Sequence, residues 1–138
     1  MNKTNHHEII QRYFEAWSTG NIELFDELLA TEYINHTPSL PDHPGVDGLK
    51  YIVSAIRKGF PDLHYEILRI SAEGDLVAVQ TLMIGTNTGE LFGAAPTGNK
   101  IRVSQMQFER IENGKIIEHW RITDEALIQR QLAGESKA

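Results

Sequence analysis

Residues 100–123, KIRVSQMQFERIENGKIIEHWRIT, determine which fold the chain can adopt. Polar and apolar side chains alternate on both sides of Asn113-Gly114, and this alternation is typical of β-strands. Asn-Gly is the pair that a two-residue type I′ turn requires. The stretch therefore predicts a tight antiparallel hairpin of two long strands, residues 100–111 and 115–123.

Two more strands are predicted before this hairpin, over residues 63–72 and 76–88, which are rich in β-branched and aromatic residues. Apolar residues at helical spacing predict helices in four other segments, namely Ile9 to Trp17, Leu24 to Leu29, Leu49 to Phe60 and Leu127 to Leu132. Gly20 would end the first helix, while Asn21 and Asp47 would cap the second and third. Three prolines between residues 38 and 45 predict a loop.

Helices followed by antiparallel strands indicate an α+β fold, in which helices cover one face of a curved sheet. A cavity between the helices and the sheet is expected, and such concave sites usually bind small molecules. No linker or repeat divides the chain, so a single domain over residues 1–138 is predicted, with frayed ends at 1–6 and 134–138.

Composition excludes several classes of function. The formal net charge is -6, and no compact basic face is evident, so we expect no nucleic-acid partner. No apolar run approaches the roughly 20 residues of a membrane-spanning helix. Cysteine is absent, which excludes disulfides and thiolate metal sites and favours a reducing, cytoplasmic location.

Four segments, by their order and spacing, resemble the SnoaL-like polyketide cyclases of the nuclear transport factor two-like superfamily. They are Tyr33-Ile34-Asn35-His36, Phe60-Pro61-Asp62-Leu63, the run from Gly85 through Pro96-Thr97-Gly98, and Glu118-His119-Trp120 followed by Asp124. The resemblance implies a cone-shaped α+β barrel that dimerises through its exposed sheet face. It also implies an intramolecular aldol condensation that closes a ring in a polyketide ester, with acid/base residues and no cofactor.

Asp124 matches the position of the family's acid/base aspartate, so the resemblance implies a catalytic role. A partly buried carboxyl group there would have a raised pKa and could move protons. Alternatively, Asp124 could cap the terminal helix, since Glu125 and Ala126 follow it. By the same resemblance, His36 would lie near the mouth of the pocket, where it would assist catalysis or bond the backbone of its loop.

Alternation along the last strand assigns its side chains to two faces. Trp120 and Ile122 share one face with Asp124, and His119 shares the other with Arg121. We therefore expect Trp120 to form a wall of the pocket and His119 to lie at an interface or the surface. A β-bulge would exchange the two faces.

Four more residues are candidates for substrate binding. Gln105 and Gln107 project from one face of their strand, where they could polarise a substrate carbonyl or form a hydrated surface or dimer contact. Trp17 is expected to line the cavity, and Asn35 lies beside His36. The histidines lack the spacing of metal ligands, and no phosphate loop or dinucleotide fingerprint occurs, so neither metal nor cofactor is predicted.

The predicted function is a cofactor-free cyclase, or a related lyase or isomerase, acting on a small hydrophobic ketone or ester. One alternative is a non-catalytic domain of the same fold that binds a small molecule or acts as a dimeric interaction module. Another is an epoxide hydrolase or dehydratase, in which Arg121 would pair with a carboxylate.

Overall fold

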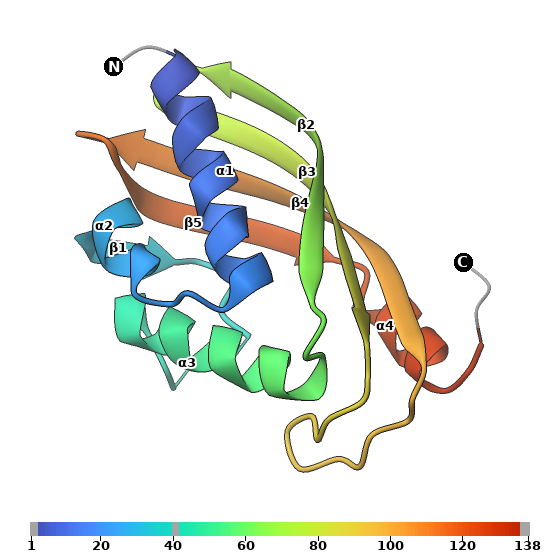
Figure 1. Ribbon diagram of the computed structural model, residues 1–138. Coiled ribbons are helices and arrows are strands. Elements are labelled where there is room, and N and C mark those ends of the chain that lie inside the picture. Colours follow the sequence, from blue (N-terminus) through green and yellow to red (C-terminus); the bar gives the residue numbers. More distant parts are fainter. Residues whose placement is uncertain (1–2, 40–41, 136–138) are drawn as a thin grey trace.

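The computed structural model describes residues 3–39 and 42–135 and confirms the α+β prediction. Its elements, in chain order, are α1 (Lys3–Thr19), α2 (Leu24–Leu28), β1 (Leu29–Asn35), α3 (Gly45–Gly59), β2 (His64–Glu73), β3 (Leu76–Thr86), β4 (Lys100–Glu112), β5 (Lys115–Thr123) and α4 (Glu125–Leu132). The sheet curves strongly, and α1 and α3 lie against its concave face, which is called the inner face below (Figure 1).

The sheet has the strand order β1-β5-β4-β3-β2. The last four strands in sequence form an antiparallel meander, and β1 adds to its edge in parallel to β5. At the predicted turn, Asn113 and Gly114 have φ values of 53° and 77°, and Glu112 pairs with Lys115. Positive φ at both positions is the requirement of a type I′ turn, so that prediction is confirmed.

The four predicted strands are all present, with bounds that differ from the prediction by two residues or fewer. β1 was not predicted, and Leu29, expected to end a helix, begins this strand. The reason is that α2 has only five residues, after which buried Leu29 and Ala30 continue the apolar pattern in extended form. The sequence pattern of a short helix followed directly by a strand looks like one longer helix.

Two predicted helix caps are wrong. Glu23, not Asn21, precedes α2, and it makes no side-chain cap bond. Pro44 precedes α3, and Asp47 lies within the first turn of this helix. The negative charge of Asp47 interacts favourably there with the helix dipole. The first helix ends as predicted, because Gly20 follows it with φ of 80°.

The two ends of the described chain belong to or follow helices. Residues 3–6 are part of α1, and the fraying expected at both ends stays a prediction. After α4, the backbone N–H of Gly134 donates to the carbonyl oxygen of Gln131, and Glu135 donates to Arg130. The remaining terminal residues, 1–2 and 136–138, lie outside the described part of the chain. No described helix is both long enough and apolar enough to cross a membrane.

The loop between β3 and β4 packs tightly on the end of α3. The buried side chain of Asn87 donates to the carbonyl oxygen of Gly59 and to that of Gly89, at 3.1 and 3.0 Å. The backbone N–H of Gly89 also donates to Gly59, at 3.2 Å. A Cβ atom at Gly89 would lie 1.9 Å from the carbonyl oxygen of Lys58, so only glycine fits here.

We therefore expect Gly89→Ala to lower the free energy of unfolding by about 1–3 kcal/mol, the usual range for overpacking. The backbone of Lys58 must move to relieve the clash, and the loop must detach partly from α3. Urea denaturation followed by circular dichroism measures the change. The matched control is Thr88→Ala, because Thr88 is exposed in the same loop. Equal stability of Gly89→Ala and the control would contradict the packing described.

Candidate functional site

A cavity of about 730 Å³ lies between α1, α3 and the inner face of the sheet. Aromatic and aliphatic side chains form most of its wall, among them Tyr13, Phe14, Trp17 and Ile52. Polar side chains form the rest, several of them from the adjacent strands β4 and β5. A hydrophobic molecule of moderate size would fit such a wall, and the polar side chains would orient it.

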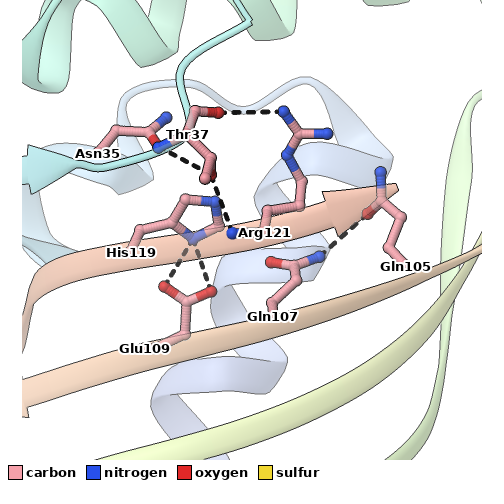
Figure 2. A network of polar contacts seen from close by, with 7 residues as sticks. All are labelled: Asn35, Thr37, Gln105, Gln107, Glu109, His119 and Arg121. Atoms are coloured by element: carbon pink, nitrogen blue, oxygen red, sulfur yellow. Dashed lines mark hydrogen bonds and ion pairs between the residues drawn. The ribbon is translucent and has the colours of Figure 1, made fainter. Parts of the chain in front are cut away.

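On these two strands, Gln105, Gln107, His119 and Arg121 belong to the wall, and Glu109 lies behind His119. These five residues are called the polar strip below. Strand register brings these residues together: Gln107 pairs with Arg121, and Glu109 pairs with His119. Alternate residues of a strand point to the same face, so all five lie on the inner face of the sheet. Figure 2 shows them side by side on the two strands.

Glu109 and His119 form a buried pair. Nδ1 of His119 lies 2.9 and 2.8 Å from the two carboxylate oxygens of Glu109. The exposed fraction is 0% for Glu109 and 3% for His119. Because a carboxylate only accepts hydrogen bonds, Nδ1–H donates, and Nε2 of the neutral ring is left as an acceptor. Nε2 lies on the side of the ring away from Glu109, and His119 is part of the cavity wall (Figure 2).

Burial raises the pKa of the Glu109 carboxyl group above its usual value, and His119 partly opposes that rise. The Glu109 carboxylate stabilises a positive charge on the His119 ring through the bond to Nδ1. The pair can therefore take up a proton through Nε2 and return it. This is the chemistry of a general acid and base.

The glutamines and two tyrosines add neutral groups to this wall. Nε2 of Gln107 donates to Oε1 of Gln105 at 3.0 Å, which fixes both amides. Burial raises the pKa of Tyr13 and of Tyr65, so both hydroxyl groups stay protonated at neutral pH. Protonated hydroxyl and amide N–H groups can stabilise a developing oxyanion.

Arg121 is fixed by the end of β1 and the loop after it. Its guanidinium donates to the carbonyl oxygen of Thr37, to Oγ of Ser39 and to Oγ1 of Thr123. Its backbone N–H donates to Oγ1 of Thr37 at 2.9 Å, and Asn35 in turn accepts from the backbone of Thr37 (Figure 2). Within the described residues no carboxylate lies within 4.0 Å of Arg121, so the ion pair expected for an epoxide hydrolase is not formed there.

The structure brings four of the sequence-predicted residues to the cavity wall. They are Trp17, Asn35, Gln105 and Gln107. The two glutamines are buried, with exposed fractions of 4% and 5%, so the alternative of a hydrated outer surface is wrong. Substrate binding by these four residues stays a prediction.

Trp120 and His36 lie elsewhere, on the opposite, outer face of the sheet. Their rings stack with centroids 4.6 Å apart, and Nε2 of His36 lies 2.9 Å from a carboxylate oxygen of Glu118. Neither belongs to the cavity wall. The predicted orientation of the last strand is therefore wrong: His119 faces the cavity, and Trp120 faces away.

Asp124 is exposed and caps α4, because its Oδ1 accepts the backbone N–H of Leu127 at 3.1 Å. The capping alternative is confirmed, and the predicted partial burial of this carboxyl group is wrong. Asp124 is not among the cavity residues, although its neighbours Thr123 and Glu125 are. A catalytic role for Asp124 or His36 is an untested prediction.

The pairing of Glu109 with His119 was not predicted from the sequence. The signal was present in principle, since both residues belong to the predicted hairpin. Counting back from the turn without a bulge pairs Glu109 with Glu118, whereas the observed register shifts between Ile111 and Arg110. One extra residue in β5 therefore separates the expected site from the observed one.

No group of three His, Cys, Asp or Glu side chains in the described part of the chain is arranged to hold a metal ion. The polar strip contains one imidazole and one carboxylate, and these bond to each other. The observed contacts of the strip are those of a proton-transfer pair.

A known protein family matches nearly the whole chain. The profile of the SnoaL-like polyketide cyclase family matches residues 7–132. Aklanonic acid methyl ester cyclase DnrD of Streptomyces peucetius is 28% identical over 131 residues, which cover 91% of this chain and 88% of that protein. Nogalonic acid methyl ester cyclase of Streptomyces nogalater is 29% identical over 106 residues, covering 75% and 79% of the two chains.

Solved structures show the same fold. IdmH of Streptomyces antibioticus is 29% identical and superposes with a TM-score of 0.82, over 92% of this chain and 97% of that one. TsrD of Streptomyces laurentii superposes with a TM-score of 0.86 at 21% identity, over 96% and 97% of the two chains. The second likeness concerns the fold alone.

Proposed function

Since the chain belongs to the SnoaL-like polyketide cyclase family, we propose that it closes a ring in a hydrophobic keto ester or ketone by an intramolecular aldol reaction. The observation that carries this proposal is the buried Glu109–His119 pair on the wall of an otherwise largely apolar cavity. An aldol reaction needs a base for a C–H group and an acid for the resulting alkoxide. One imidazole supplies both in turn.

In the first step, Nε2 of His119 takes a proton from the carbon next to a substrate carbonyl. The electrons of the broken C–H bond form an enolate, and the ring becomes an imidazolium. Glu109 stabilises that positive charge through the bond to Nδ1. The amide groups of Gln105 and Gln107 lie on the same wall, where an N–H donor would stabilise the enolate oxygen.

In the second step, the enolate carbon attacks the carbon of another carbonyl group in the same molecule. A carbon–carbon bond forms, and the π electrons of the attacked carbonyl move to its oxygen. This alkoxide takes the proton back from Nε2–H of His119. The product is an isomer of the substrate, and the Glu109–His119 pair returns to its starting state.

The test uses the substrates for which the relatives are named. The purified chain is incubated with aklanonic acid methyl ester and nogalonic acid methyl ester, and the products are separated by liquid chromatography with mass detection. We expect a new isomer of unchanged mass, formed faster than without protein. In D₂O, the chain should also catalyse exchange of the acidic C–H proton, which nuclear magnetic resonance detects. The proposal would be refuted if the chain catalysed neither cyclisation nor proton exchange with either ester.

We further propose that two copies of the chain associate through the outer face of the sheet. Met106, Phe108 and Ile122 are apolar residues there with exposed fractions of 56%, 49% and 77%. Register places Phe108 opposite Trp120 and Met106 opposite Ile122, so they form one continuous patch on β4 and β5. Apolar patches of this kind are typical of interaction sites.

Phe108→Lys is therefore expected to convert a dimer into a monomer, because the dimer would bury the lysine charge against apolar side chains. Light scattering coupled to gel filtration measures the mass at micromolar concentration. Tyr51→Lys is the matched control, since Tyr51 is similarly exposed but belongs to α3, on the other side of the sheet. A monomeric mass for the unmodified chain, or a dimer that survives Phe108→Lys, would contradict this assembly.

A further inference from the structure

Arg121 is a positive charge in the cavity wall that the proposed aldol steps do not use. Its three side-chain hydrogen bonds go to a carbonyl oxygen and two hydroxyl groups, all of which are neutral. Those acidic side chains of the described residues that form ion pairs do so with other bases, for example Glu118 with Arg110 and Asp26 with Lys50. The positive charge of Arg121 therefore lacks a direct anionic partner within that part of the chain.

This is an unusual position for a charge in a protein whose formal net charge is -6. A guanidinium in a partly desolvated cavity is costly unless an anion neutralises it. The other titratable groups of the cavity wall are His43, His119, Glu125 and the protonated tyrosines Tyr13 and Tyr65, with Glu109 behind His119. Glu109 already bonds to His119, and Glu125 lies more than 4.0 Å from Arg121 by the ion-pair criterion.

The guanidinium is also held in place. Bonds to Thr37, Ser39 and Thr123 fix its orientation from two sides, the loop after β1 and β5. Figure 2 shows the bond to Thr37. A guanidinium has five N–H groups, so these bonds leave two for a ligand. A fixed guanidinium with free N–H groups is suited to bind a carboxylate, because little side-chain entropy is lost on binding.

We propose that Arg121 binds a carboxylate of the substrate, so that the cavity accepts a hydrophobic keto acid with a free, ionised acid group. The inference rests on the proposed function, since it takes the cavity to be the substrate site. The relatives are named for methyl esters, whose oxygens are neutral. A methyl ester would leave the charge of Arg121 uncompensated, whereas a carboxylate would neutralise it and position the reacting carbonyl along the polar strip.

The test compares two probes that differ only in this group, 2-naphthoic acid and methyl 2-naphthoate. Binding to the purified chain is measured at pH 7 by isothermal titration calorimetry. We expect the acid to bind at least about tenfold more tightly than the ester, the usual gain from a hydrogen bond to a charged group. Arg121→Met should abolish that preference and leave the affinity for the ester nearly unchanged.

Arg69→Met is the matched control, because Arg69 is exposed on β2 and is not part of the cavity wall. It should keep the full preference for the acid. Arg121→Lys retains the charge without the planar fork and should keep part of the preference, provided that circular dichroism shows it folded. If Arg121→Met does not fold, the preferences of the unmodified chain and of Arg121→Lys for the acid over the ester test the inference.

Equal affinity for acid and ester, no binding of the acid at millimolar concentration, or a preference that survives in folded Arg121→Met would each overturn the inference. The binding readout is independent of ring closure. A preference for the acid without cyclisation would therefore refute the proposed reaction and support the carboxylate site. Cyclisation of esters without a preference for the acid would support the proposed reaction and refute the carboxylate site.

Discussion

His119→Gln will lower kcat/KM for ring closure by about 10²- to 10⁴-fold, the usual contribution of a general acid or base. The glutamine amide can still donate a hydrogen bond to Glu109, but it cannot take a proton from carbon. Binding depends mainly on the apolar wall, so we expect the loss in kcat and only a small change in KM. Initial rates of isomer formation at several substrate concentrations measure both quantities.

Two variants separate this prediction from the one made by family resemblance. Asp124→Asn keeps a good helix cap, because asparagine caps helices as well as aspartate does. His36→Gln removes an imidazole from the outer face. If His119 is the base, both variants keep their activity. Loss of activity in Asp124→Asn, with normal rates in His119→Gln, would instead assign the acid/base role to Asp124.

Local sequence signals were sufficient for much of the fold. The Asn113-Gly114 turn fixed the hairpin, and the long strands have an alternation that no helix would tolerate. β1 was harder to predict because its first residues continue the apolar pattern of α2, and its partner β5 is more than eighty residues away. No local pattern indicates a parallel pairing over that distance.

The candidate site was predicted less well because it inverts the usual distribution of polarity. On β4 and β5, polar side chains face inward and large apolar ones, such as Phe108 and Ile122, face outward. A prediction based on burying apolar residues therefore turns Trp120 inward and His119 outward. The register shift in β5 places both Ile116 and His119 on the inner face, which strict alternation forbids.

The same inversion places a titratable carboxyl group in the interior, and this should be measurable as a dependence of stability on pH. Burial raises the pKa of Glu109 in the folded chain above its value in the unfolded chain. The folded state therefore binds this proton more tightly. The bound proton contributes fully to the free energy of unfolding below the pKa of the unfolded state, near 4.3. This contribution is lost as the pH rises through the raised pKa of the folded state.

Glu109→Gln removes this titration and keeps the shape and a hydrogen bond to His119. We expect the variant to gain stability relative to the unmodified chain as the pH rises from 4 to 8, by about 1.4 kcal/mol for each unit of raised pKa. Urea denaturation at several pH values measures the difference. Glu112→Gln, exposed on the same strand, should show no such trend. A difference between Glu109→Gln and the unmodified chain that is constant with pH would mean that Glu109 has the same pKa in the folded and the unfolded chain, which would contradict the raised pKa.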